Sequence, residues 1–155
     1  MELKLWQKNI LYMLIIIGVG FVLFNVAFIL AGIVHVVYRI AIIPLINKFN
    51  HAKILYVSWH YFYIIFVLLI SWLIFRKQFN NLVKATFSTL PMIVILTEVG
   101  IQFYHWSVLV WIIGTIIVGL IFLYLYKTKR SWLYYFATIY VVVVELFVML
   151  SGMEI

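Results

Sequence analysis

Long apolar stretches without basic residues constrain this chain more than any other feature. The longest lacks both Lys and Arg over 42 residues, 85–126. One helical crossing of a bilayer needs about 20 apolar residues, because each residue advances a helix by about 1.5 Å across a hydrocarbon core of about 30 Å. This stretch is therefore long enough for two crossings. We predict a tight turn near His105, where the segment GIQFYHWS interrupts the apolar run.

Dividing the rest of the chain into apolar runs in the same way predicts five spans in total. They form a single domain, because no Pro-, Gly- or Ser-rich linker separates two parts. The first apolar run exceeds one crossing, so we expect a tilted or over-long helix, followed by an interfacial segment at 40–50. A β-barrel is not expected, since barrel strands alternate apolar and polar residues, whereas these runs are continuously apolar. The predicted spans are 10–37, 54–75, 85–104, 107–126 and 131–150.

Composition agrees with an all-α integral membrane protein. Hydrophobic residues make up 68% of the 155 residues and charged residues 10%, against about 25% charged residues in soluble domains. The chain contains neither Cys nor Asp, which excludes disulfides, thiolate metal sites and aspartate dyads. The net charge of +7 arises from basic residues in the short gaps between apolar runs. The basic residues form no continuous stripe along which nucleic-acid phosphates could bind, so nucleic acid is not an expected partner.

The distribution of Lys and Arg predicts the orientation. Five spans leave three basic residues on one side, Arg39, Lys48 and Lys53. The side with more basic residues is usually cytoplasmic, so we expect the N-terminus inside and the C-terminus outside, in a cell membrane or an organellar inner membrane. If the first run held two spans, roughly four basic residues would lie on one side and seven on the other, which is a weaker bias. The eight basic residues on the predicted inner side are Lys4, Lys8, Arg76, Lys77, Lys84, Lys127, Lys129 and Arg130.

Each predicted span carries one face of small or polar residues at helical spacing. We expect these faces to point into the bundle, with Ile, Val, Leu and Phe facing lipid. The pair Thr115 and Gly119 has the small-xxx-small spacing that suits close helix contact. In chain order the faces comprise Gly18, Asn25, Gly32, His35 and Arg39; His60, Tyr63 and Ser71; Ser88, Pro91, Glu98, Gln102 and His105; Ser107, Gly114, Thr115 and Gly119; Thr138 and Glu145.

The ionisable side chains are predicted to lie at one level in the outer half of the membrane. Glu98 is about 13 residues into its span, roughly 20 Å from the cytoplasmic edge, and Glu145 and His60 reach nearly the same depth. An intramembrane carboxylate costs about 2.5–3.5 kcal/mol, so we expect each one to be protonated or to pair with Arg39 or a histidine. The alternative is that these pairs only hold helices together. The predicted polar layer, for binding or relay, comprises Glu98, Glu145, His60, Arg39, His35, Gln102, His105 and Asn25.

Three functional hypotheses follow from this layer. The first is binding within the membrane, as an accessory subunit of a larger membrane complex or as a homo-oligomer. The second is translocation of a proton, an ion or a small solute by intramembrane Glu and His. In the third, His35 and His60 are haem ligands with Arg39 facing a propionate, or they bind a divalent metal with His105 and Glu98.

No catalytic residue and no cofactor signature are predicted. Neither Ser58 nor Ser107 lies in a nucleophile-elbow pattern, and there is no HExxH motif.

Overall fold

The computed structural model describes residues 4–44 and 59–151, of which 89% are helical and none form strands. Five helical segments are long and apolar enough to span a membrane. The prediction of an all-helical chain with five such segments is therefore confirmed. The segments are Leu5–Ile42, Trp59–Arg76, Asn81–Gln102, Ser107–Lys127 and Trp132–Leu150.

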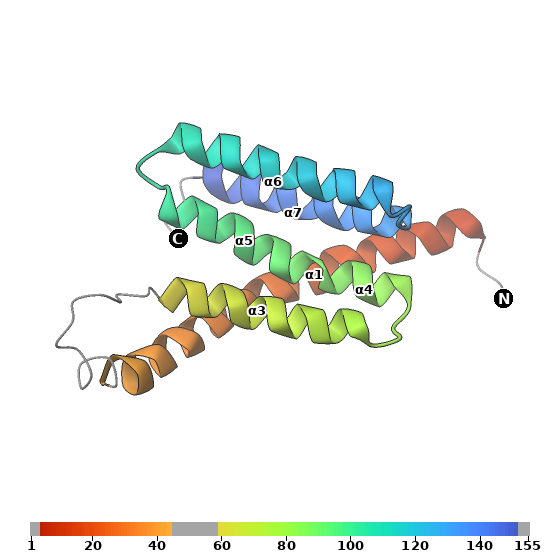
Figure 1. Cartoon of the computed structure of the whole chain (residues 1–155). Helices are drawn as coiled ribbons and strands as arrows, with labels where there is room; N and C mark the ends of the chain where they lie inside the picture. Colours follow the sequence, from red (N-terminus) through yellow and green to blue (C-terminus); the bar gives the residue numbers. More distant parts are fainter. Residues whose placement is uncertain (1–3, 45–58, 152–155) are drawn as a thin grey trace.

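The helices pack side by side as a bundle (Figure 1). The long α1 crosses the bundle diagonally, with α3 on one side of α5 and the pair α6 and α7 on the other. The first helix begins and the last helix ends at opposite ends of the bundle. In chain order the elements are α1 (Leu5–Val37), the π-helical turn η1 (Tyr38–Ile42), α3 (Trp59–Arg76), α4 (Asn81–Phe87), α5 (Thr89–Gln102), α6 (Ser107–Lys127) and α7 (Trp132–Leu150).

The α4–α5 segment occupies the centre of the bundle. α5 packs against α1, α3, α6 and α7, and half of the α4–α5 span is buried, compared with 11% of α6. Small and hydroxyl-bearing side chains let neighbouring backbones approach closely in a membrane. Ala85, Thr86, Ser88 and Thr89 supply such side chains, and all four are buried. Side chains that follow on α5 are therefore held in the interior.

Helix α4 ends at Phe87 and α5 begins at Thr89, so the central span is interrupted at Ser88. Pro91 has no N–H and cannot donate to the carbonyl of Phe87, four residues earlier. Hydroxyl groups bond to carbonyls in the preceding turn: Ser88 Oγ donates to the Ala85 carbonyl at 2.6 Å, and Thr89 Oγ1 to the Thr86 carbonyl at 2.7 Å. These bonds satisfy backbone acceptors where water cannot reach them.

Two predicted boundaries are wrong. α4 begins at Asn81, so residues 81–84 are helical, although the predicted span begins only at 85. Asn80 Oδ1 accepts the N–H of Val83 at 2.9 Å and caps the helix earlier than expected.

At the end of α1, residues 40–42 continue the first helix and do not start a separate interfacial segment. The N–H of Ile43 donates to the carbonyl of Tyr38, one residue further back than in an α-helix. Residues 45–50 of the predicted interfacial segment and 54–58 of the second predicted span lie outside the described residues.

The predicted inward faces are observed on α3 and α7. Tyr63 and Ser71 of α3 are buried, as are Thr138 and Glu145 of α7. The Tyr63 hydroxyl donates to the carbonyl of Ala27 in α1 at 2.8 Å. Polar groups on these two helices therefore find partners inside the bundle.

The inward face predicted for α1 is wrong. Gly18, Asn25, Gly32, His35 and Arg39 are all exposed. The α1 side chains that pack inward are instead mostly apolar. Lipid and a protein interior are similarly apolar, so an Ile or Leu side chain does not indicate which face of the helix points inward. The buried α1 residues are Ile16, Gly20, Leu23 and Ala27.

Most of the face predicted for α6 is also exposed, including Ser107, Thr115 and Gly119. α6 packs only against α5 and α7 among the described helices, so most of its surface lies on the outside. Small residues on α6 therefore border open space and do not form a tight helix contact.

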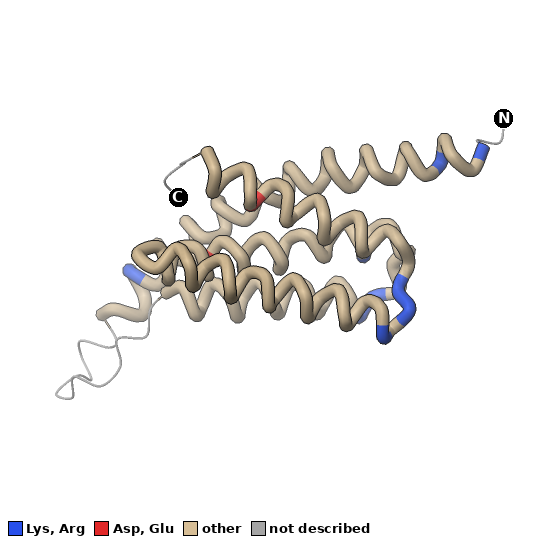
Figure 2. The backbone as a smooth tube through the Cα atoms, turned by 90° about the horizontal axis from the view of Figure 1, so that it is seen from above, with Lys and Arg blue, Asp and Glu red and all other residues tan. Residues whose placement is uncertain are grey.

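The basic residues gather at one end of the bundle (Figure 2). The start of α1, the α3–α4 connection and the α6–α7 connection meet at that end. Arg39 belongs to η1, which directly follows the end of α1 at the other end of the bundle (Figure 1). The uneven distribution of Lys and Arg along the sequence is therefore also an uneven distribution in space.

Candidate functional site

The shortest polar contact between two helices joins α3 to α5. His60 Nδ1 and Glu98 Oε2 are 2.7 Å apart. Only 4% of the Glu98 side chain and 20% of the His60 side chain are exposed. A carboxyl group buried this deeply needs a polar partner, and the imidazole provides one across the helix interface. The structure contains the predicted pairing of Glu98 with a histidine.

The second buried glutamate has a different partner. Glu145 of α7 is buried, and its Oε1 accepts a hydrogen bond from Thr97 Oγ1 of α5 at 2.9 Å. Within residues 4–44 and 59–151, His60 and Glu98 are the one basic and acidic pair within salt-bridge distance, so Glu145 has no basic partner there. Of the two expected alternatives for Glu145, pairing with Arg39 or a histidine is therefore not observed, and its partner is a neutral hydroxyl.

The two carboxyl groups lie at one level and contact different flanks of α5. Glu98 and Thr97, the partner of Glu145, are consecutive residues of α5, so their side chains point about 100° apart around the helix. Glu98 therefore faces α3 and Glu145 contacts α5 from the α7 side. Depth counting along the sequence predicted this common level for Glu98, Glu145 and His60.

The indole of Trp59, at the start of α3, belongs to the same region. The Trp59 indole lies 3.9 Å from the His60 ring and 5.0 Å from the His35 ring, measured between centroids. Because the indole contacts both imidazoles, the two histidines are not presented as opposed axial ligands. They do not fit a haem, and within the described ranges no group of three or more metal-ligating side chains occurs.

The remaining predicted members of the polar layer are not brought together. Arg39 and Asn25 lie on the outer surface of the first helix, and Gln102 and His105 are exposed at the end of α5. His105 contacts the ring of Tyr104 at 5.6 Å. The assembled part of the layer therefore consists of His60, Glu98 and Glu145, with His35 joined to His60 through Trp59, and with Thr97 and Trp59 as unpredicted neighbours.

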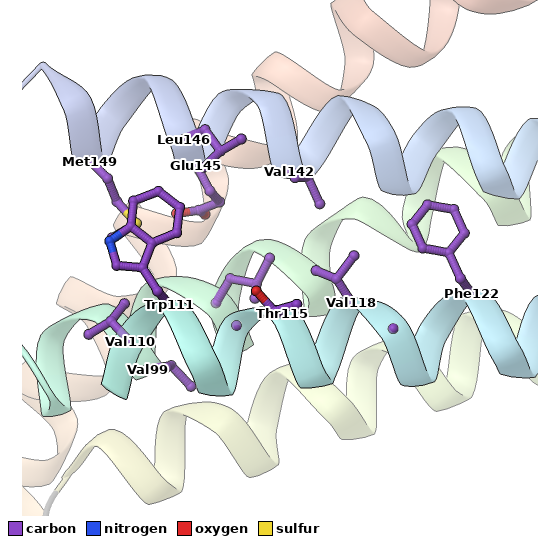
Figure 3. Close-up of a pocket in the computed structure, with 13 residues that line it drawn as sticks. Val99, Val110, Trp111, Thr115, Val118, Phe122, Val142, Glu145, Leu146 and Met149 are labelled. Atoms are coloured by element: carbon purple, nitrogen blue, oxygen red, sulfur yellow. The ribbon is translucent and has the colours of Figure 1, made fainter. Parts of the chain in front are cut away.

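Glu145 also lines a groove between α5, α6 and α7 (Figure 3). The groove encloses about 390 Å³, and apolar side chains form most of its wall. Trp111 of α6 is 45% exposed, which places the mouth of the groove on the outer surface. The lining residues are Leu96, Val99, Val110, Trp111, Gly114, Thr115, Val118, Gly119, Phe122, Val142, Glu145, Leu146 and Met149.

The sequence contained part of the signal for this groove. Glycines at 114 and 119 were interpreted as a surface for close helix contact, but no heavy atom lies within 4 Å of a Cβ built on either one. Space left by missing side chains thus becomes a groove. Trp111 was not predicted, since one aromatic residue in an apolar run carries no distinguishing pattern.

Comparison with protein-family models, with curated proteins and with solved structures returns no match to this chain.

Proposed function

We propose that this protein acts by binding within the membrane, as an accessory subunit that docks onto a transmembrane helix of a larger membrane protein. The observation that carries the proposal is Asn25, a polar residue exposed near the middle of the first apolar helix. A polar side chain at that depth is costly against lipid and is usually found against protein.

The surroundings of Asn25 support a helix partner. We define the α1 outer face as Gly18, Val22, Asn25, Ile29 and Gly32, which share one side of the helix at spacings of three and four. Val22 is 57% exposed and Ile29 is 61% exposed. Neither Gly18 nor Gly32 has a heavy atom within 4 Å of an added Cβ. Small residues flanking a polar one favour close helix association in a bilayer.

Asn25 retains bonding capacity for such a partner. Its Nδ2 donates to the carbonyl of Phe21 in its own helix at 2.8 Å. A carboxamide has two N–H donors and a carbonyl acceptor, so one intrahelical bond leaves further sites. Interhelical hydrogen bonds of this kind contribute roughly 0.6 to 2 kcal/mol in membranes.

The basic end of the bundle supports an orientation with the N-terminus in the cytoplasm and the C-terminus outside. Basic residues near the ends of spans are retained on the cytoplasmic side. On this proposal the layer of His60, Glu98 and Glu145 lies in the outer half of the membrane.

Site-specific photo-crosslinking in native membranes tests the docking role. A photo-reactive residue at Val22, beside Asn25, is expected to form an adduct with another membrane protein. Leu120 on α6 is similarly exposed, at 60%, and serves as the control position, where no such adduct is expected. Asn25→Leu and Gly18→Leu in the Val22 background should each remove the adduct, since one deletes the polar contact and the other blocks close approach.

Three outcomes would overturn the proposal: an adduct from Leu120 equal to that from Val22, an adduct that survives both substitutions, or an adduct made only of two copies of this chain. The last outcome would replace the accessory role with self-association.

A further inference from the structure

We propose that the groove between α5, α6 and α7 binds a lipophilic organic cation, with the cationic group against Glu145 and the apolar body along α6. This ligand site goes beyond the proposed docking role of α1 and does not depend on it. It lies on other helices and involves none of the residues of the α1 outer face.

The shape and the walls of the groove suit an apolar body. A volume of about 390 Å³ is within the range of about 300–1,000 Å³ typical of small-molecule sites. Gly114 and Gly119 leave the α6 wall without side chains, whereas Val118 and Phe122 continue it as an apolar surface. The mouth of the groove opens beside the exposed Trp111, on the outer surface of the bundle. A ligand that enters there comes from the lipid and must itself be soluble in lipid.

The charge of the ligand follows from Glu145. It is the one acidic residue of the groove, and no lysine, arginine or histidine lines it. Its hydrogen bond from Thr97 engages Oε1 alone. An ionised carboxylate in an apolar site is stable only with a counter-charge. A bound cation supplies the charge that the groove itself lacks.

Trp111 adds a second element of cation recognition. Its indole extends from α6 toward the Glu145 carboxyl on α7, with Met149 beside it (Figure 3). The face of a tryptophan ring attracts organic cations, and the attraction grows when water is excluded. A carboxylate and an indole at one end of an apolar groove together favour an ammonium or phosphonium group.

The depth of the site is compatible with a ligand held below the lipid headgroups. Glu145 lies five residues before the end of α7, or roughly 8 Å along the helix axis. A cation with a bulky apolar body partitions to this depth, whereas a headgroup phosphate remains at the interface. The site therefore discriminates by lipophilicity and by charge.

Equilibrium binding to the whole chain in phosphatidylcholine nanodiscs tests the inference. The probe is radiolabelled tetraphenylphosphonium, with empty nanodiscs subtracted to remove partitioning into lipid. Tetraphenylborate has the same shape and the opposite charge. We expect saturable binding of the phosphonium and none of the borate.

Four variants make the test specific to the groove. Glu145→Gln keeps the size of the side chain and should weaken phosphonium binding by about tenfold or more. Glu98→Gln removes the same charge at the same level but outside the groove, and it should change the affinity by no more than about twofold. Gly114→Leu should abolish binding by filling the groove, whereas Gly100→Leu, also in open space but off the groove, should not.

The outcomes separate cleanly. Loss of binding in Glu145→Gln and Gly114→Leu, with folding verified by circular dichroism, supports the cation site. Equal binding of both probes identifies a neutral apolar groove, and equal losses in Glu145→Gln and Glu98→Gln identify a general charge effect. Either of these results, or the absence of saturable phosphonium binding, overturns the inference. None of them bears on crosslinking from Val22.

Discussion

At the scale of single residues, Glu98 and Glu145 illustrate two ways of holding a carboxyl group inside a helix bundle. Glu98 faces His60, a group that can share a proton with it at 2.7 Å. Glu145 has a threonine hydroxyl and an adjoining groove. The partner of Glu98 is itself ionisable. The partner of Glu145 is a neutral hydroxyl, and the groove beside it has room for a charged ligand, which is why we place the binding site at Glu145.

Gly20 carries the sharpest prediction about packing at this scale. A Cβ on Gly20 would lie 2.6 Å from Cε1 of Tyr140, in the contact between α1 and α7. Gly20→Ala should therefore lower the free energy of unfolding by about 1–3 kcal/mol, as overpacking does elsewhere. Reversible unfolding of the purified protein in mixed micelles measures the change.

Gly18→Ala is the matched control, because no heavy atom lies within 4 Å of a Cβ at that position on the same helix. It should leave stability unchanged or raise it by up to about 1 kcal/mol, because alanine favours a helix more than glycine does. Adding Tyr140→Val to Gly20→Ala should recover part of the loss by removing the opposing ring. Equal losses in the two alanine variants would mean that the Gly20–Tyr140 contact does not limit packing.

At the scale of elements, the interruption between α4 and α5 is the feature that departs most from a regular helix. One proline removes a backbone donor, and hydroxyl groups of Ser88 and Thr89 bond to carbonyls of the preceding turn. Such an interruption is tolerated because the segment is buried among other helices. It also lets the α4–α5 span carry Glu98 at the centre of the bundle.

A double-mutant cycle tests this account of the interruption. Thr89→Val removes a buried hydroxyl and should lower the free energy of unfolding by about 1 kcal/mol. Pro91→Ala removes the ring that kinks the helix, so the Thr86 carbonyl can accept a regular backbone bond from the Leu90 N–H, and the same substitution should cost clearly less. Unfolding in mixed micelles again gives the free energies.

Ser71→Ala provides the comparison for that cycle. Its hydroxyl is also buried and bonds to the Val67 carbonyl, but in the unbroken α3. The cost of Ser71→Ala should not depend on residue 91. If Thr89→Val costs the same with and without Pro91, the hydroxyl bonds do not compensate for the proline.

At the scale of the whole molecule, the basic residues define an end and the glutamates define a layer away from it (Figure 2). The proposed orientation puts the basic end in the cytoplasm. The ligand groove and the His60–Glu98 pair then belong to the outer half of the membrane. Both proposed binding surfaces, the α1 outer face and the groove, open sideways toward lipid.

Cysteine labelling in intact cells tests the orientation, and the chain contains no native cysteine to interfere. Ser107→Cys at the start of α6 should react with a membrane-impermeant maleimide added outside. Thr128→Cys, at the other end of the same helix, should react only after the membrane is permeabilised. Both positions are exposed, so access differs only by side. Labelling of both from the same side would refute the five-span topology.

The sequence alone determined the helical class, the five apolar segments, the turn near His105 and the common level of His60, Glu98 and Glu145. These properties depend on distance along the chain, and a helix converts residue number directly into depth. Even the errors at helix ends were local, since a single cap at Asn80 moved the start of α4.

The tertiary structure alone decided which face of each helix points inward and which polar groups meet. The predicted face of α1 lies outside, Arg39 pairs with neither glutamate among the described residues, and Thr97 takes the place predicted for a charged partner. The physical reason is the solvent. In water, hydrophobicity marks the buried face, but in lipid both faces of a helix are apolar, and detailed packing decides between them.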